Sequence, residues 1–535
     1  MTLLPPTNPY EREFRIVARQ VLSAWNRDPG SPSYGSMDRP YWGWKYKDFS
    51  DSTMQYGLNV AIAFARRSGG LVAIRPWLDA TVRYMGRIQW GDGSFDQCYP
   101  HEKSPGVFFD FLATLVDLHG SGLLSKDAAA ELEGIIRRGV VFLMRTDEKH
   151  GEVANHIAQY GYELLHYAKA FGDAPAEARG REYIARALSW FDRDEGWFRE
   201  YHGPDAGYQT RTLRYLTKTG LLYPDLNLWP VVDKAMEFMD VVVMPDGTIN
   251  PLLGCRSTAL IYPYSFEVAA RRDARFAPLA ARIQKAWDDG LVPLPSSLDF
   301  GNAIRLGDDA REAADLVAAK PLAPSVAPAQ PERVDFPNAG IFVRRSASQA
   351  VYVGSGLGGA VVIYRRSLEG AWRLAVEDGG YLLAEGGRRY VTRVPAAGMA
   401  AAVTDDSITI EAGFFLSLHE DVKTYQMVAL RILNSTVLRI QWIGDLFRKV
   451  VVRRLMGRRV TKEAKLHRTV TIHDASVTID DRIAPDPTTA GGRLYRARRA
   501  SGIHMASSRY FQPVEFESAP GGWEEEVPAS STRGL

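Results

Sequence analysis

The stretch Lys320-Pro321-Leu322-Ala323-Pro324-Ser325-Val326-Ala327-Pro328 divides this sequence into two parts with different hydrophobic patterns. Residues 318–337 consist mostly of proline and alanine, which is typical of a linker between domains. The chain has 535 residues, of which 46% are apolar, so it is long enough and apolar enough for two cores. We therefore predict one domain on each side of this linker.

Before the linker, the apolar residues recur at spacings of three and four, which predicts amphipathic helices. The segments with this pattern are Glu11–Trp25, Thr53–Arg67, Val107–Leu118, Ala128–Met144, Asn155–Ala170, Glu182–Phe191, Gln209–Leu216, Pro230–Val241, Ala259–Arg271 and Pro278–Asp288. Their connections are short, which favours antiparallel helical hairpins.

Three of these connections share a chemistry in which an acidic residue precedes glycine and a small or aromatic residue follows. They are Gly91-Asp92-Gly93-Ser94-Phe95, Asp194-Glu195-Gly196-Trp197-Phe198 and Pro245-Asp246-Gly247-Thr248-Ile249. A ring of helical hairpins would repeat such a turn around one end of the ring, although Asp-Gly is common in turns of any kind. We predict that residues 1–317 form an incomplete (α/α) toroid.

After the linker the hydrophobic period falls to two, as in Ala350–Val353, Ala360–Tyr364, Ser407–Ile410 and Thr469–Ile472. Many short strands with turn residues between them predict an antiparallel β-sandwich over residues 338–518, without helices. The tail 519–535 is expected to be loose. The basic run from Arg448 to Arg468 favours a solvated strand edge, and an acidic glycan lying along it is the alternative.

Charge and cysteine content exclude several classes of partner and site. The net charge is +2, so no global field attracts the protein to nucleic acid or to anionic lipid. Cys98 and Cys255 are too few for a disulfide framework or a four-ligand zinc site. We find no HExxH, Walker or dinucleotide-binding motif. The sequence therefore predicts no metal, no cofactor, no nucleic acid and no membrane as partner, and it leaves the oligomeric state open, with a homodimer as one option.

The N-terminal residues Met1–Pro6 lack a basic region followed by an apolar run. No stretch reaches the ~20 apolar residues of a membrane span. We therefore expect a cytoplasmic protein, or a secreted or periplasmic one if a leader has been removed.

Aromatic residues and a few polar residues are the candidates for ligand contact. Trp42 and Trp44 lie in the aromatic and basic segment Tyr41–Tyr46, where rings could stack on a sugar or simply pack. Asn155 and His156 open a predicted helix, and Tyr208 follows 53 positions after Asn155. Each of these residues alone is ordinary, because an Asn-His pair is more often a helix start.

Together with the two-domain pattern, these residues resemble the heparinase II/III and alginate lyase group of polysaccharide lyases. In that group an Asn or Asn-His pair precedes a catalytic Tyr by a similar interval, in a helical toroid that is followed by a β-sandwich. The resemblance implies β-elimination on a uronic-acid-containing glycan, without a cofactor. Such a reaction removes the C5 proton beside a carboxylate whose charge must first be neutralised.

By position, the resemblance implies that Asn155 neutralises the carboxylate, that His156 assists it or acts as base, and that Tyr208 is base or acid. Tyr has an ordinary pKa near ~10, so it needs a nearby cation. Arg211 lies three residues after Tyr208 on the same helix face, and Arg256 is a second candidate cation. The residues expected near the substrate by loop position are Gln97, His101, Glu200 and His202.

The sequence departs from this group early in the sandwich, where those enzymes carry a further active-site histidine. Here Tyr364-Arg365-Arg366 occupies the corresponding stretch. Either one of these residues takes that role, or Tyr208 acts alone, or the activity has changed or been lost. Two alternatives to a lyase stay open: a non-catalytic glycan-binding or biosynthetic accessory protein, and a glycoside hydrolase with two carboxylates from Asp92, Asp96, Glu102, Glu200 and Asp205.

Overall fold

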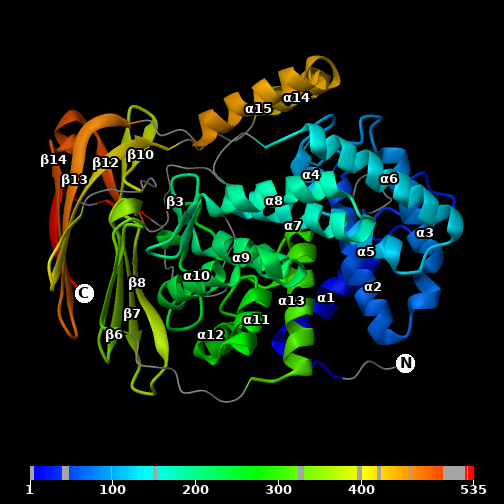
Figure 1. Cartoon of the computed structure of the whole chain (residues 1–535). Helices are drawn as coiled ribbons and strands as arrows, with labels where there is room; N and C mark the ends of the chain where they lie inside the picture. The colour runs from blue at the N-terminus through cyan, green and yellow to red at the C-terminus, as the bar shows by residue number, and fades with distance from the viewer. Residues whose placement is uncertain are drawn as a thin grey trace.

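A computed structural model of the chain has helices in the first part and antiparallel sheets in the second (Figure 1). It describes residues 5–38, 47, 49–97, 99–148, 153–322, 331–393, 401–417, 423–456, 460–497, 524–526 and 528–535. Trp42, Trp44 and Cys98 lie outside the described residues. The predicted order, a helical toroid and then a β-sandwich, is confirmed.

The helical domain is a ring of paired helices. Its helices are α1 (Pro9–Ala24), α2 (Gly57–Ser68), α3 (Leu71–Ile88), α4 (Pro105–Phe109), α5 (Leu112–Gly120), α6 (Lys126–Arg145), α7 (Ala154–Phe171), α8 (Ala174–Leu188), α9 (Ala206–Leu222), α10 (Trp229–Val242), α11 (Tyr264–Arg272), α12 (Ala277–Asp288) and α13 (Phe300–Ala319). Helices α5, α7, α9, α11 and α13 contact one another in this order, and α7, α9, α11 and α13 pair with α8, α10, α12 and α1. Since α13 also contacts α2, the last helix returns to the first ones.

The repeated turns are structurally equivalent. Gly93, Gly196 and Gly247 have φ of +92°, +89° and +85°, which is left-handed backbone that favours glycine. A Cβ on these glycines would lie 2.1, 2.3 and 2.2 Å from the carbonyl oxygens of Arg138, Lys234 and Arg282, on α6, α10 and α12. Gly35 meets Ala80 on α3 in the same way, with φ of +91°. Each turn thus packs directly on the backbone of an outer helix, and only glycine fits.

The second domain has two antiparallel sheets. The first has the order β4 (Arg333–Phe336), β5 (Ile341–Arg345), β6 (Gln349–Gly354), β7 (Ala360–Arg366), β8 (Trp372–Asp378). The second has the order β16 (Glu524–Glu526), β15 (Arg493–Ala497), β9 (Tyr381–Glu385), β10 (Arg388–Val391), β12 (Ser407–Leu416), β13 (Val460–Ile472), β14 (Val477–Ala484), β17 (Ser530–Gly534), with β11 (Ala401–Val403) beside β12.

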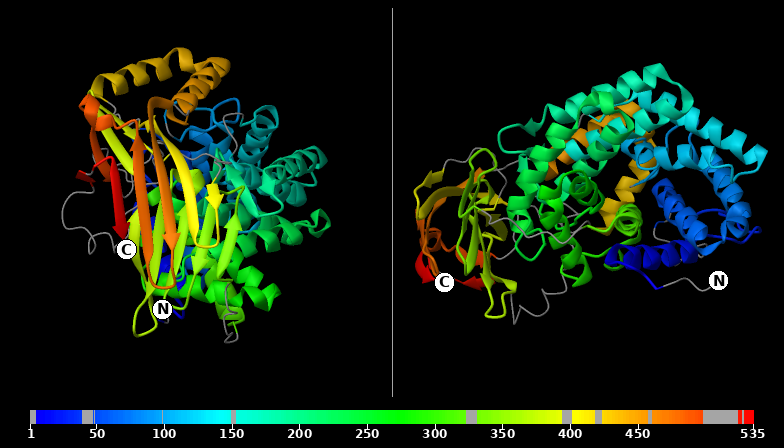
Figure 2. Two further views of the ribbon diagram at one scale, coloured as in Figure 1. Left: turned by 90° about the vertical axis from the view of Figure 1, so that its left-hand side faces the viewer. Right: turned by 60° about the horizontal axis from the view of Figure 1, so that its bottom comes forward.

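Side chains of the first sheet alternate between the core of the sandwich and the core of the helical domain. Val351, Val353 and Val361 point to one side and pack with Ile408 and Val470 of the second sheet. The intervening residues, among them Tyr352, Val362 and Tyr364, belong instead to the core of the helical domain. The first sheet is therefore buried on both faces, with the sandwich beside the toroid (Figure 2).

The structure differs from the sequence prediction at two places in this domain. The C-terminal segment, predicted to be loose, forms β17 and pairs with β14. Two helices that were not predicted, α14 (Thr424–Ser435) and α15 (Gln441–Met456), lie between β12 and β13. Arg448, Lys449, Arg453 and Arg454 of the basic run are therefore helical, and only its later part lies on a strand.

A buried carboxyl on α7 predicts a pH-dependent stability. Glu163 accepts a hydrogen bond from the backbone N of Ala113 at 2.5 Å, and burial raises the pKa of Glu163 to about 8. Between pH 4.5 and 8 the folded state keeps a proton that the unfolded state has lost, so stability falls as pH rises through this window, by roughly 5 kcal/mol at 1.36 kcal/mol per pKa unit. In thermal melts of Glu163→Gln, we expect the melting temperature to lose this decrease between pH 4.5 and 8.

The exposed Glu131 on α6 gives a matched control. Glu131→Gln should keep the pH dependence of the wild-type melting temperature. If Glu163→Gln keeps the dependence as well, Glu163 is not its source.

Candidate active site

Four segments of the toroid bring the predicted residues together. The start of α7 carries Asn155 and His156, and the start of α9 carries Tyr208 and Arg211. Between α8 and α9 lies a small sheet of β1 (Phe191–Asp192), β2 (Trp197–Glu200) and β3 (Gly203–Pro204), and β2 ends at Glu200. The loop after Pro251–Leu253 carries Arg256.

Glu200 is the centre of a buried network. Its Oε1 accepts hydrogen bonds from the backbone N of Asn155 at 2.9 Å and from Asn155 Nδ2 at 2.8 Å. Its Oε2 accepts from a terminal guanidinium nitrogen of Arg256 at 2.8 Å. All three side chains are buried. Because both carboxylate oxygens are used, Glu200 fixes Arg256 relative to the start of α7.

Arg256 in turn covers Tyr208. Its guanidinium carbon lies 3.5 Å from the centroid of the Tyr208 ring and 5.3 Å from that of Tyr201. Burial alone would lower the pKa of Arg256, yet Tyr208 and Glu200 raise it above its ordinary value. The site therefore holds a permanent cation against the face of the candidate catalytic tyrosine.

Two further residues hold the Arg256 loop in place. Asp205 caps α9 by accepting from the backbone N of Tyr208 at 3.0 Å, and its other oxygen accepts from the backbone N of Arg256 at 2.8 Å. Burial raises the pKa of Asp205 to about 6. From the sandwich, Arg393 donates to the carbonyl oxygens of Pro251 at 2.7 Å and of Gly254 at 3.0 Å. The second domain thus supports the site through Arg393, and among its described residues no histidine takes part in these contacts.

His156 is oriented by a carboxylate that sequence reasoning missed. Its Nδ1 lies 3.2 and 3.3 Å from the two carboxylate oxygens of Glu148, which also accepts from the Tyr160 hydroxyl. Since an ionised carboxylate only accepts, Nδ1 carries the proton and Nε2 of a neutral ring is left as the acceptor. The His156 side chain is 34% exposed, so this acceptor belongs to a side chain that solvent reaches.

Arg211 belongs to a second cluster one turn along α9. It donates to Gln159 Oε1 at 2.7 Å and to Asp110 Oδ1 at 3.4 Å, while Arg305 donates to Asp110 Oδ2 at 2.6 Å. Burial would raise the pKa of Asp110, but the two guanidinium groups lower it below its ordinary value. Arg211 is thus partly neutralised by Asp110.

Several predicted substrate contacts lie elsewhere or only at the edge of this network. The ring of His101 lies 4.3 Å from that of Trp90, centroid to centroid and tilted by 36°, and His101 accepts from Arg439 of the second domain at 3.1 Å. Gln97 belongs to the same loop, where its backbone N donates to Glu102 at 3.2 Å. The backbone N of His202 donates to the carbonyl oxygen of Glu200 at 2.9 Å, which places this residue beside the network.

The early sandwich residues are not part of this network among the described contacts. Tyr364 is buried between the domains, where its hydroxyl lies 3.1 Å from Thr248 Oγ1. Burial raises its pKa well above the ordinary value, so Tyr364 is placed as a core residue. Arg365 follows it on β7 and is exposed.

Tyr201 is a further residue of the site that sequence reasoning missed. It follows Glu200 in the turn between β2 and β3, with φ of +60°, which is uncommon for a residue other than glycine. Burial raises the pKa of Tyr201 to about 12. Strained backbone of this kind often occurs at functional sites, but no sequence signal marks it. Within the described residues there is also no cluster of three or more His, Cys, Asp or Glu that could hold a metal ion.

No protein-family model and no curated protein matches this sequence. Among solved structures, the chondroitin AC lyase of Streptomyces coelicolor A3 in complex with chondroitin sulphate is 12% identical, with a TM-score of 0.52 over 92% of this chain and 69% of that one. Heparinase III is 10% identical, with a TM-score of 0.47 over 95% and 75%. A heparan sulfate lyase from Pedobacter heparinus is 11% identical, with a TM-score of 0.42 over 92% and 71%. The resemblance is confirmed at the level of the fold: the chain is built like the chondroitin lyase, a polysaccharide lyase.

Proposed function

We propose that this protein is a polysaccharide or oligosaccharide lyase that cleaves a uronic-acid-containing glycan by β-elimination. The observation that carries the proposal is the guanidinium of Arg256 held 3.5 Å from the Tyr208 ring by a buried ion pair with Glu200. A cation beside a phenol stabilises the phenolate that forms when the phenol gives up its proton. Tyr208 is therefore suited to proton transfer.

The proposed reaction uses the protein's own side chains and no cofactor. His156 Nε2 removes the C5 proton, and the electron pair moves to form the C4–C5 double bond as the C4–O bond breaks. Tyr208 gives its hydroxyl proton to the departing oxygen, so the atoms and charges balance. Arg211, whose cluster with Asp110 and Arg305 keeps one net positive charge, would neutralise the uronate carboxylate, so that it can accept electron density.

The geometry supports a positioning role for Asn155 in place of the direct carboxylate contact that the family resemblance implied. Its side chain is fully buried and its amide donates to Glu200. Its Oδ1 is buried and has no hydrogen-bond partner among the described residues. Asn155 thus acts on Tyr208 through Glu200 and Arg256.

The hydrolase alternative is less well supported by the same contacts. Glu200 and Asp205, two of its candidate carboxylates, are buried. Their oxygens accept hydrogen bonds from Asn155, Arg256 and the start of α9. A glycosidase needs one carboxyl to protonate the leaving group and another to activate water or attack the sugar. Two carboxylates committed to structural hydrogen bonds are poor candidates for these tasks.

The test is incubation of the full chain with chondroitin sulfate, heparan sulfate, hyaluronan, alginate and polygalacturonate. We expect near-ultraviolet absorbance to rise with one of them, because elimination creates an unsaturated uronate. New reducing ends without absorbance would instead indicate a hydrolase, and binding without either product would indicate a non-catalytic protein. Both of these outcomes would overturn the proposal.

A further inference from the structure

The two helices between β12 and β13 expose an unusual amount of apolar surface. We call the segment from Lys423 to Met456 the helical hairpin; it comprises α14, the turn Val437–Arg439 and α15. Fifteen large apolar side chains are exposed among the described residues, and ten of them lie in this hairpin, between Tyr425 and Val450. The hairpin lies along one edge of the molecule, outside the layers of both domains (Figures 1 and 2). A patch of this kind indicates a binding surface.

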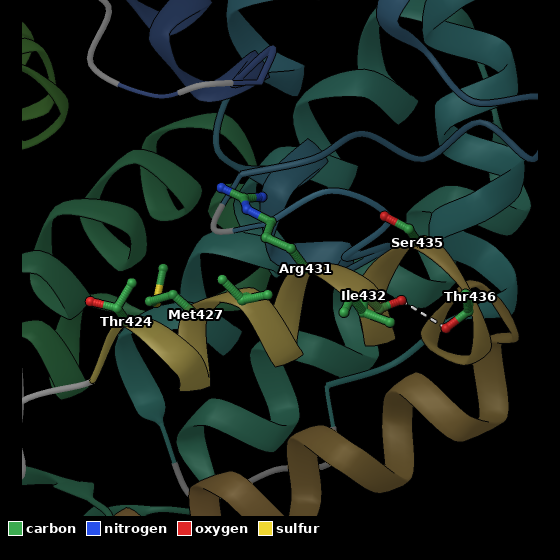
Figure 3. Close-up of a pocket in the computed structure, with 7 residues that line it drawn as sticks. Thr424, Met427, Arg431, Ile432, Ser435 and Thr436 are labelled. Atoms are coloured by element: carbon green, nitrogen blue, oxygen red, sulfur yellow. Dashed lines mark hydrogen bonds between the residues drawn. The ribbon is translucent and has the colours of Figure 1, made fainter.

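The exposed apolar residues form stripes along both helices. On α14, Tyr425, Val428 and Ile432 follow one face, and Tyr425 and Ile432 are 66% and 60% exposed. On α15, Trp442, Leu446 and Val450 are spaced by four residues, and Trp442 is 67% exposed. On α14, Met427, Val428, Ile432 and their neighbours line an open hollow of about 720 Å³ (Figure 3). Apolar stripes of this kind are typical of helices that bury one face at an interface.

Among the described contacts, two arginines of the hairpin reach the toroid. The Arg439 Nε donates to His101 Nε2 at 3.1 Å, and the guanidinium of Arg431 lies 5.4 Å from the centroid of the Phe49 ring. Only Asn434 and Leu438 are buried among the hairpin residues whose side chains are described. The contacts thus fix the position of the hairpin and leave its apolar stripes uncovered.

The hairpin also concentrates positive charge. Its sequence holds seven basic residues and one acidic residue, Asp445, for a net charge of +6; the basic residues are Lys423, Arg431, Arg439, Arg448, Lys449, Arg453 and Arg454. The whole chain carries +2, so the remainder carries 2 − 6 = −4. The small total charge, from which we predicted no attraction to lipid, therefore conceals a strongly basic segment in an acidic protein.

We propose that the helical hairpin binds the surface of an anionic lipid bilayer. Helices with an apolar stripe and many Lys and Arg residues lie in the plane of such an interface, and each basic residue near it adds attraction. The helices have 12 and 16 residues, shorter than a membrane span. No described helix of the protein is both long and apolar enough to cross a membrane. The inference goes beyond the proposed lyase activity and does not depend on it.

Charge and exposure together favour a bilayer over two other occupants. A second copy of the chain would bring two segments of +6 together, which like-charge repulsion opposes. A soluble acidic glycan would satisfy the basic residues but would leave aliphatic side chains such as Val428, Ile432 and Leu446 in water. An anionic bilayer offers both a negative surface and an apolar interior.

Sedimentation of the full chain with vesicles tests the proposal. We expect binding to vesicles of equal parts phosphatidylcholine and phosphatidylglycerol, and little binding to phosphatidylcholine alone. Lys423→Gln and Lys449→Gln should each weaken binding about fivefold, and added salt should weaken it further. Trp442→Ser and Ile432→Ser should each weaken binding by about tenfold or more. The matched control is Leu368→Ser, which removes an exposed leucine from the turn between β7 and β8 and should change nothing.

Circular dichroism melts of each variant establish that the fold is retained. Absence of binding to the anionic vesicles at low salt would overturn the proposal. So would a wild-type dimer in size-exclusion chromatography that Trp442→Ser converts to a monomer, because the stripes would then be a protein interface. Equal binding to both vesicle types, unaffected by the lysine substitutions, would contradict the role of charge.

Discussion

Tyr208→Phe is expected to lower kcat for elimination by about 10²- to 10⁴-fold, the range that general acid–base catalysis contributes. Only the hydroxyl oxygen is lost, so the ring can still lie under Arg256, 3.5 Å from its guanidinium carbon. Because the hydroxyl proton is needed at the departing oxygen, the loss should fall on kcat, with KM little changed. The measurement is the initial rate of absorbance increase with the glycan that the wild-type protein cleaves.

Two other tyrosines serve as controls. Tyr215 lies two turns further along α9 and is also buried, so Tyr215→Phe should keep most of the activity. Tyr201 lies near the same guanidinium, at 5.3 Å. If Tyr201→Phe abolished the activity while Tyr208→Phe retained it, the assignment of Tyr208 as proton donor would be wrong.

The toroid could be predicted because its signals are local. A turn that packs on the backbone of an outer helix requires glycine, and this requirement gave a recurring sequence motif at Gly93, Gly196 and Gly247. Gly35 makes the same contact but lacks the acidic neighbour, so it was missed. The helix predicted over Val107–Leu118 is broken into α4 and α5 at Phe111, whose φ of −139° is not helical, and the backbone N of Ala113 beyond the break donates to Glu163 on α7. That interruption comes from tertiary contacts, which periodicity does not record.

The helical hairpin was missed for a different reason. Its sequence alternates short runs of β-branched residues, such as Val450–Val452, with pairs of basic residues, so it resembles a strand edge. The positive charge of the hairpin is also cancelled in the net charge of the chain by the acidic remainder, and from that small net charge we predicted no membrane partner.

The candidate site could be predicted only as a set of residues. Glu200 was predicted from its loop position and Arg256 as a second candidate cation, but nothing in the sequence indicated that they form one ion pair. Glu148 and Tyr201 carried no signal at all, because their roles depend on what lies opposite them in space. Conversely, Tyr364 was a candidate substitute for histidine by sequence position, and the sheet instead points it into the core between the domains.

Glu200→Gln is expected to destabilise the toroid by about 3–5 kcal/mol, the cost of removing one partner from a buried ion pair. The Arg256 guanidinium, which is buried, would lose its carboxylate. The glutamine oxygen can accept either from Asn155 or from Arg256, and the amide nitrogen then meets the donors of the other residue. Chemical denaturation of the variant, compared with the wild-type protein, measures this loss.

A double-mutant cycle separates the ion pair from general damage to the site. Arg256→Gln alone should also destabilise the protein, because it leaves the Glu200 carboxylate buried with only the Asn155 donors. The double variant Glu200→Gln, Arg256→Gln holds no uncompensated charge, so its cost should be smaller than the sum of the single costs by more than ~1 kcal/mol. Additive costs would contradict the pairing. The double variant should still cleave the glycan poorly, because restored stability does not restore the cation over Tyr208. Substitution of this one pair of residues would then separate the effect on stability from the effect on activity.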